Sequence, residues 1–209
     1  QVVCTGGTTS FTASGGVTTG ATYQWEVSIN GGGSYSNVTN GGVYSGATTN
    51  SLTVTGATAG MNGYLYRVVV SGTCPGPATS TAATLTVNTP VVIGTQPVSA
   101  TICEDGTVEF TAAATGTGLT YQWYEGPLTA LSDAGVYSGT STDKLTLTNV
   151  PSGFNGRTYY VRVSGACGAA VNSSVATLTV NEEPEITLQP LGQVVCTGGT
   201  TSFTASGGV

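Results

Sequence analysis

A stretch of the chain occurs twice without a single change. Residues 1–17 and residues 193–209 both read QVVCTGGTTSFTASGGV. The sequence therefore holds one long unit of 192 residues, from Gln1 to Gly192, and then the opening of a second copy. Repetition at a fixed period is typical of rods, stalks and filaments built from stacked units. We expect this chain to be a window cut from a longer repetitive protein.

A weaker repeat lies inside the long one. Cys4, Cys103 and Cys196 follow one another at intervals of 99 and 93 residues, and a phenylalanine comes seven residues after each. Three motifs recur in the same order: YQW at 23–25 and 121–123, GVYSG at 42–46 and 135–139, and ATLTVN at 83–88 and 176–181. The sequence predicts a first domain at 1–88 that lacks its first strand, a second at 89–181, and the start of a third at 182–209.

Each of these domains is predicted to be all-β. Segments such as 10–14, 22–27 and 64–70 alternate polar and apolar residues or are rich in β-branched and aromatic ones, and Gly, Asn and Pro separate them. Only 7% of the residues are charged, and 32 glycines accompany many Thr and Ser residues. This composition favours short strands joined by tight turns, with a hydroxyl-rich surface.

About seven short strands in roughly 95 residues resemble an immunoglobulin-like β-sandwich. Trp25 and Trp123 occupy the place of the core tryptophan on strand C of that fold. Tyr66 and Tyr159 stand where the tyrosine corner of strand F is found, two residues before the strand-F core position. The resemblance implies tandem immunoglobulin-like sandwiches in a linear array.

Both ends of the usual core disulfide of that fold are replaced by apolar residues. Phe11 and Val68 stand there in the first domain, and Phe110 and Val161 in the second. Apolar pairs of similar bulk are tolerated in cores, so we expect these residues to pack together. The cysteines must then have another role.

Units with a Cys before strand B, a Tyr-x-Trp and a Val-Ser-Gly-x-Cys after strand F are similar to the repeats of giant surface adhesins. Those adhesins occur in gliding and other Bacteroidota-type bacteria and are exported by type IX secretion. The resemblance implies an extracellular, cell-surface location and a non-catalytic role in adhesion or gliding motility.

In a sandwich of this topology Cys4 and Cys74 lie at opposite ends of one domain, about 40 Å apart, which is too far for a disulfide. We therefore expect an interdomain Cys4–Cys167 bond. Cys74, Cys103 and Cys196 would pair with cysteines of neighbouring repeats outside this window. A Cys4–Cys74 bond within one domain and buried free thiols remain alternatives. Disulfides indicate an oxidising, extracellular setting.

Few other residues suggest chemistry. The chain has no histidine, which removes Ser-His and Cys-His pairs and makes a zinc site improbable. Four scattered basic residues against ten acidic ones disfavour nucleic acid, and no apolar run has transmembrane length. The acidic linker 181–186 offers oxygen ligands for Ca²⁺, but the matching linker 88–93 has no acid. We expect no enzyme activity, no cofactor and no metal.

Surface contact is predicted for Tyr35, Tyr44 and Tyr137 and for the long loop 29–42. The leading hypothesis is a structural stalk or filament segment whose partners are the neighbouring repeats of the same chain. A multivalent module that binds glycans or surfaces is the first alternative. Accessory immunoglobulin-like domains of a secreted enzyme are the second.

Overall fold

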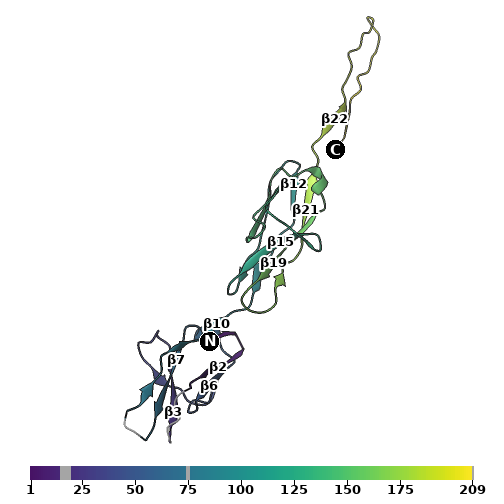
Figure 1. The fold of residues 1–209 in the computed structure, drawn as a ribbon. Coiled ribbons are helices and arrows are strands. Elements are labelled where there is room, and N and C mark those ends of the chain that lie inside the picture. Colours follow the sequence, from purple (N-terminus) through teal and green to yellow (C-terminus); the bar gives the residue numbers. More distant parts are fainter. Residues whose placement is uncertain (15–19, 74–75, 209) are drawn as a thin grey trace. The chain divides into compact units, whose positions relative to one another are not determined.

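The computed structural model describes residues 1–14, 20–73 and 76–208, which form short β-strands and two single 3-10 turns (Figure 1). The chain divides into two compact units. The first unit comprises residues 1–92 together with the segments 115–119 and 164–170, and the second comprises the remaining residues. The units thus interleave along the sequence, and the domain boundaries at residues 88 and 181 stay a prediction.

The first unit contains a β-sandwich. One sheet has the strand order β2-β6-β5, the other has the order β4-β3-β7-β8 with β9 also paired to β7, and β1 runs parallel to β10. The 3-10 turn η1 (Ala59–Met61) precedes β7. The strands are β1 (Val2–Cys4), β2 (Thr8–Thr12), β3 (Thr22–Ser28), β4 (Ser36–Asn37), β5 (Tyr44–Ser45), β6 (Ser51–Thr55), β7 (Leu65–Ser71), β8 (Ala78–Thr79), β9 (Ala83–Thr84) and β10 (Thr86–Asn88).

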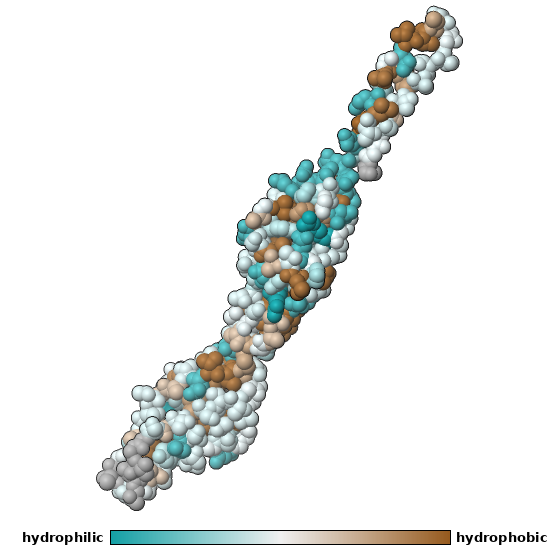
Figure 2. Space-filling model, turned by 45° about the vertical axis from the view of Figure 1, so that its right-hand side comes forward, coloured by the Kyte–Doolittle hydropathy of each residue, from teal (hydrophilic) through white to brown (hydrophobic). Residues whose placement is uncertain are grey.

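Alternation along β2 and β6 separates a buried face from a hydroxyl-covered one. Phe11 lies opposite Leu52 in the register, and both side chains are buried. On the other face the Ser10 and Thr53 hydroxyls lie 3.1 Å apart across the strands, as hydrogen-bonded cross-strand pairs do. Figure 2 shows the result on the face of this unit that is in view: most of it is pale, neither strongly hydrophilic nor strongly hydrophobic.

The core of the first sandwich is built around Phe11, Trp25, Tyr66 and Val68, all of them buried. The rings of Phe11 and Tyr66 have centroids 4.7 Å apart, a spacing typical of favourable aromatic pairs. Trp25 also donates its indole N–H to the carbonyl of Thr49 at 2.9 Å, so its polar atom is satisfied inside the core.

The second unit repeats this architecture. One sheet has the order β13-β18-β17, another has the order β12-β21-β19-β15-β16 with β20 also on β19, and β11 pairs with β14. The 3-10 turn η2 (Ser152–Phe154) precedes β19. The strands are β11 (Val92–Thr95), β12 (Ala100–Cys103), β13 (Val108–Thr111), β14 (Ala113–Thr115), β15 (Thr120–Glu125), β16 (Thr129–Ala130), β17 (Tyr137–Ser138), β18 (Lys144–Leu147), β19 (Thr158–Ser164), β20 (Val171–Asn172) and β21 (Ala176–Asn181).

The core of the second sandwich contains the equivalent residues Phe110, Trp123, Tyr159 and Val161, each at most 1% exposed. Trp123 donates its indole N–H to the Thr142 carbonyl at 2.9 Å, as Trp25 does to Thr49 in the first sandwich. The all-β, immunoglobulin-like sandwich fold expected from the sequence is confirmed.

One detail of the expected fold differs. In a tyrosine corner the hydroxyl bonds to the backbone a few residues upstream. Here the Tyr66 hydroxyl lies 3.0 Å from the hydroxyl of Tyr44, and the Tyr159 hydroxyl lies 3.5 Å from that of Tyr137. Tyr44 on β5 and Tyr137 on β17 thus provide the partner that a backbone group provides in a tyrosine corner.

The second copy of the repeated stretch has few partners in this structure. Among residues 182–208 the strands are β22 (Glu185–Leu188) and β23 (Ser206–Gly208), which pair with each other. Phe203 is 65% exposed, whereas its counterpart Phe11 is 3% exposed. Hydrophobic brown surface accordingly appears along the segment that carries β22 (Figure 2).

Candidate functional site

The feature that most distinguishes the first unit is a disulfide between residues far apart in sequence. Cys4 is the last residue of β1, and Cys167 lies in the segment 164–170 that belongs to the same compact unit. The two are bonded, with Cα atoms 5.8 Å apart and a sequence separation of 163 residues. The Cα distance is ordinary for a disulfide. Cys167 is buried and Cys4 is exposed.

The backbone carbonyl of Asn88 holds the Cys4 side of this bond. Cys4 lies opposite Asn88 in the parallel β1–β10 pair. Thr5 then donates both its backbone N–H, at 2.9 Å, and its hydroxyl, at 3.1 Å, to the Asn88 carbonyl. The Cys167 sulfur lies 3.6 Å from the same oxygen, as a contact only, because a disulfide sulfur carries no proton to donate.

A small hydrogen-bonded network holds the Cys167 side. The backbone N–H of Ala166 donates to the carbonyl of Thr117 at 2.7 Å, and the N–H of Thr117 donates to the carbonyl of Thr89 at 3.2 Å. The Thr89 N–H donates in turn to the Thr117 hydroxyl at 2.9 Å. Thr89 and Thr117 thereby fasten the segments 115–119 and 164–170 to the chain just after β10.

Two glycines allow these segments to approach closely. A Cβ on Gly165 would lie 2.8 Å from a methyl carbon of Val91 and 3.0 Å from the Thr117 carbonyl oxygen. A Cβ on Gly116 would lie 3.0 Å from the Pro90 carbonyl oxygen, at a backbone φ of +146°. Larger residues at either position would push the segments away from residues 89–91. Asn88, Thr89, Thr117 and both glycines were not predicted as site residues. The repeated motif ATLTVN, which ends in Asn88 and Asn181, is a signal that could have indicated Asn88.

The second unit carries the same arrangement around Cys103. β12 runs parallel to β21 with Cys103 opposite Asn181, and Glu104 donates its N–H to the Asn181 carbonyl at 2.9 Å. Cys103 itself is exposed and is unpaired among the described residues, as is Cys196. Cys74 lies outside the described residues. The alternative of a Cys4–Cys74 bond is wrong, because Cys4 is bonded to Cys167.

The three tyrosines expected at the surface are half-buried and occupied by other contacts. Tyr44 packs edge-on against Tyr66, and Tyr137 packs in the same way against Tyr159. The guanidinium of Arg67 lies 3.7 Å from the ring centroid of Tyr35. Each ring thus has a partner on its own sandwich, and a role of these tyrosines in surface contact stays a prediction.

The loop 29–42 is ordered by its own polar side chains. The Ser28 hydroxyl donates to the Asn30 side-chain oxygen at 2.8 Å and accepts the N–H of Gly32 at 2.9 Å. Asn30 also donates to the hydroxyl of Ser34 at 2.9 Å. The start of the loop therefore has a defined shape held by these hydrogen bonds, and Val38 near its end is buried in the core of the first sandwich.

Charged groups form pairs on the sandwich surfaces. Glu125 accepts from the Arg157 guanidinium at 2.9 Å and from the hydroxyl of Tyr137. Burial, followed by the hydrogen bond with Glu125, raises the pKa of Tyr137 above its usual value. Asp133 accepts from the Thr140 hydroxyl at 2.6 Å, which lowers the pKa of its carboxyl. These arrangements give each polar group of the pairs a hydrogen-bonding partner.

Neither a metal cluster nor a membrane-spanning helix is found in the part of the chain that the structure describes. No group of three or more Cys, Asp or Glu side chains there could hold a metal ion. No helix there has the length and apolar character needed to cross a membrane. In the acidic linker, Glu183 donates its backbone N–H to the Glu104 carboxylate at 3.0 Å.

Comparison with known proteins agrees with the fold. Residues 1–89 match a family model described as a domain of unknown function (DUF8696). The chain is similar to the I-band fragment I67-I69 from titin, with a TM-score of 0.68 and 18% identity over 91% of this chain and 65% of that one. It is also similar to the N-terminal four Ig domains of Dscam1 isoform 8.4, with a TM-score of 0.56 and 18% identity over 87% of this chain and 43% of that one.

The chain thus spans less than two thirds of these solved structures. A search of curated protein sequences gave no significant match. At 18% identity the likeness shows the fold alone. The class of protein defined here is a tandem repeat of immunoglobulin-like β-sandwiches with a disulfide between distant parts of the sequence.

Proposed function

We propose that this chain is a structural segment of a large extracellular adhesin, in which disulfides link consecutive repeats. The observation that carries the proposal is the Cys4–Cys167 bond, which joins the predicted first domain (1–88) to the predicted second (89–181). The repeated Cys–Asn backbone pairing at Cys103 and Asn181 supports the same bond one repeat further along. Neighbouring repeats are then the partners of each repeat.

A disulfide at this place would limit extension of the chain under tension. The disulfide spans 163 positions of the sequence. The residues between Cys4 and Cys167 would therefore not extend under force, even after their sandwich has unfolded. A chain attached at its two ends would lengthen only outside the bonded loop. Such a repeat suits a stalk that carries a binding tip away from a cell surface.

Single-molecule stretching of the 209-residue chain tests this role. Residues between Cys4 and Cys167 correspond to about 550 Å of extended chain. We expect this length to be missing from the final extension under oxidising conditions and to appear when the disulfide is reduced. Equal extension under both conditions would contradict the proposal. A variant with Cys196→Ser, which leaves Cys4–Cys167 in place, should behave as the unsubstituted chain does.

Location belongs to the same proposal. A disulfide that supports the fold favours an oxidising, extracellular compartment. The resemblance to Bacteroidota-type adhesins adds the cell surface, type IX secretion and gliding motility as expectations. Non-reducing peptide mapping of material taken from the native cell surface should yield the Cys4–Cys167 linked peptide. Recovery of both peptides as free thiols would count against this location.

A further inference from the structure

The outer face of the second sandwich carries a stacked pair of tyrosines. Tyr124 on β15 and Tyr160 on β19 have ring centroids 5.1 Å apart and planes within 9° of parallel. The hydroxyl of Tyr160 donates to the carbonyl of Pro127 at 3.0 Å, which fixes the position of this ring. Both rings are half-buried, whereas Trp123 and Tyr159, the residues next to them in the chain, are fully buried. The pair therefore lies on the side of the sheet that faces away from the core.

A cavity of about 440 Å³ lies beside Tyr160. Small-molecule sites in proteins have volumes of about 300–1,000 Å³. The lining includes Tyr160, Thr158, Asn172 and Val175, and all of it belongs to the second unit. Val175 is 59% exposed. The cavity thus combines a fixed aromatic ring with a hydroxyl, an amide and an apolar side chain.

This cavity lies at a gap in the edge of the sheet. β20 and β21 both pair with β19, and residues 173–175 between them lie in neither strand. The hydroxyl of Ser173 accepts the backbone N–H of Val161 at 3.0 Å and donates to the carbonyl of Ser174 at 2.8 Å. The N–H of Val161 is thus satisfied by a side chain, and the space beside Tyr160 is left open.

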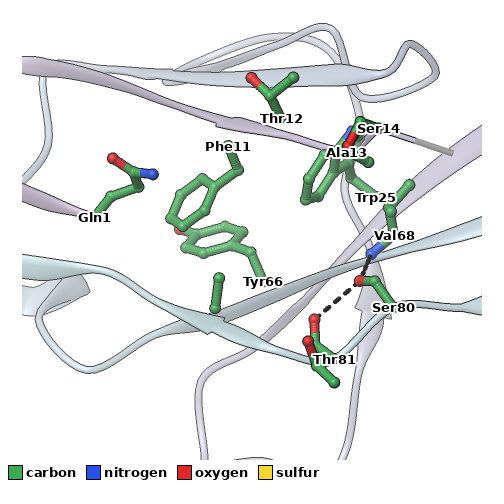
Figure 3. Close-up of a pocket in the computed structure, with 11 residues that line it drawn as sticks. Gln1, Phe11, Thr12, Ala13, Ser14, Trp25, Tyr66, Val68, Ser80 and Thr81 are labelled. Atoms are coloured by element: carbon green, nitrogen blue, oxygen red, sulfur yellow. Dashed lines mark hydrogen bonds between the residues drawn. The ribbon is translucent and has the colours of Figure 1, made fainter.

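The first sandwich has the same gap with different side chains around it. Figure 3 shows the matching serine, Ser80, whose hydroxyl bonds to the backbone of Val68 and of Thr81. Glu26 and Arg67 stand where the second sandwich has its two tyrosines, and they form an ion pair at 2.6 Å. The two sandwiches therefore differ at this place in their side chains and share the backbone arrangement.

A positive charge lies next to the cavity of the second sandwich. Arg162 is two residues after Tyr160 on β19 and lies opposite Asn172 in the pair with β20. Val161 and Val163 are fully buried, so Arg162 shares the outer face with Tyr160. Arg162 is exposed, and in the described part of the chain the three ion pairs involve the other basic residues. A guanidinium binds a carboxylate through paired hydrogen bonds, so this end of the cavity favours a ligand that carries one.

We propose that this surface binds an acidic saccharide, a pyranose sugar with a carboxylate such as galacturonate. The surface, which we call the tyrosine face, consists of Tyr124, Thr158, Tyr160, Arg162, Asn172 and Val175. The apolar C–H face of the sugar ring packs against Tyr160 and Val175. The side chains of Asn172 and Thr158 bond to its hydroxyls, and Arg162 binds the carboxylate.

The inference goes beyond the proposed stalk role, since a passive stalk requires no ligand. It does not depend on the Cys4–Cys167 bond, so either proposal can fail without the other. On the stalk proposed above, one weak site in every two-domain repeat would add up through multivalency.

Titration of the 209-residue chain with trigalacturonate, followed by nuclear magnetic resonance, tests the site. The backbone amide resonances of Thr158, Tyr160 and Asn172 should shift and saturate at millimolar concentration, with one site per chain. The methyl ester of the same trisaccharide keeps the sugar rings and loses the charge, so it should bind about tenfold more weakly. Equal binding of the two saccharides, or shifts confined to other residues, would overturn the proposal.

Arg162→Gln tests the charge without disturbing the core, because Arg162 is exposed. This variant should bind trigalacturonate about tenfold more weakly and the methyl ester as before. Lys144→Gln is the matched control, since it makes the same change of charge on β18, in the other sheet. It should bind both saccharides as the unsubstituted chain does. An equal loss in both variants would assign the effect to net charge and would refute a contact with Arg162.

Substitutions of Tyr160 test the stacking. Tyr160→Ala should abolish the binding of both saccharides, whereas Tyr160→Phe keeps the ring and should retain most of it. Thermal unfolding shows whether each variant is folded, and Arg162→Gln carries the test if Tyr160→Ala is not. Undiminished binding by folded Tyr160→Ala would overturn the proposal.

A triglutamate peptide separates a saccharide from an acidic peptide as the occupant. It carries carboxylates but has no sugar ring, so it should leave the amide resonances of the tyrosine face unshifted. Shifts as large as those with trigalacturonate would identify an acidic peptide as the occupant and would refute the saccharide.

Discussion

At the scale of single residues, the two copies of the repeated stretch allow the burial of the same residue to be compared in two surroundings. Phe11 and Phe203 have the same neighbours for ten residues before them and six after them, yet one is buried and the other exposed. Phe11 has β6 beside its strand and the ring of Tyr66 against its own, and among the described residues Phe203 lies in no strand. Burial here depends on the partners a residue has and not on its local sequence.

Phe11→Ala should lower the free energy of unfolding of the first sandwich by about 3–5 kcal/mol, because it leaves a cavity between two aromatic neighbours. Phe203→Ala should change it by no more than about 0.5 kcal/mol. Urea unfolding followed by tryptophan fluorescence measures both. Equal effects of the two substitutions would contradict the packing described for Phe11.

Ionisation of the core tyrosines provides a second test. Burial, followed by the hydrogen bonds with Tyr44 and Tyr137, raises the pKa of Tyr66 and Tyr159 well above the ordinary 10.0. Their contribution to stability is therefore complete below pH 10, where both states are protonated. It is lost as pH rises further, because the unfolded chain then releases protons that the folded one retains.

The expected loss is about 1.4 kcal/mol per pH unit above pH 10 for each tyrosine. Urea midpoints measured between pH 8 and pH 11 give the slope. Tyr66→Phe should remove the share of that slope that belongs to the first sandwich. A midpoint that does not change up to pH 11 would show that the phenols are free to ionise in the folded protein.

At the scale of elements, much of the fold was predictable from the sequence. The alternation around Phe11 predicted a strand, and the YQW motifs predicted strands with a core tryptophan. Both could be predicted because alternate burial along a strand depends on the local sequence. The partners of Tyr44 and Tyr137 were not predictable, since their hydroxyl contacts join β5 to β7 and β17 to β19 across the sandwich. Segments 115–119 and 164–170 belong to the first compact unit, and no sequence pattern indicates this membership.

The turn between β5 and β6 shows which glycines the fold requires. A Cβ on Gly46 would lie 2.1 Å from the Ser51 carbonyl oxygen, at a φ of +78°. Gly63 has a similar φ of +87° but nothing within 4 Å of the added carbon. Substitutions at the two positions therefore distinguish two contributions to the loss of stability. Both include the strain of a positive φ, and only Gly46 adds the steric overlap with Ser51.

Gly46→Ala should cost roughly 1–3 kcal/mol more stability than Gly63→Ala, because it adds overpacking to the same backbone strain. Thermal unfolding monitored by circular dichroism measures both. Gly139 lies at the equivalent turn of the second sandwich, where an added Cβ would overlap the Lys144 carbonyl oxygen. Gly139→Ala should therefore cost as much stability as Gly46→Ala. Equal costs at Gly46 and Gly63 would contradict the tight turn.

At the scale of the whole molecule, the disulfide links positions that strand patterns alone do not connect. Its pairing was predicted from immunoglobulin topology and strand length, whereas the network around Thr89 and Thr117 that supports it carries no motif. This site consists of backbone carbonyls and small residues. Every residue has a backbone carbonyl, and small residues are common in this chain, so no sequence pattern indicates the site.

Replacing Cys4 and Cys167 together by serine should lower the free energy of unfolding by about 2–4 kcal/mol, because the unfolded chain regains the freedom of a long loop. Differential scanning calorimetry measures the change. Cys196→Ser is the matched control, since Cys196 is exposed and unpaired among the described residues, and it should leave the transition unchanged. An unchanged transition in the double variant would mean that the bond adds nothing to stability.

The ion pairs have a consequence for resistance to proteolysis. The chain has only four lysine and arginine residues in all. Arg67 and Lys144 lie within β7 and β18, and Arg67, Lys144 and Arg157 each bind a carboxylate. Trypsin-like proteases need an extended, accessible backbone with a free basic side chain. A folded repeat of this kind offers such enzymes very few places to cut, which favours long persistence in protease-rich surroundings.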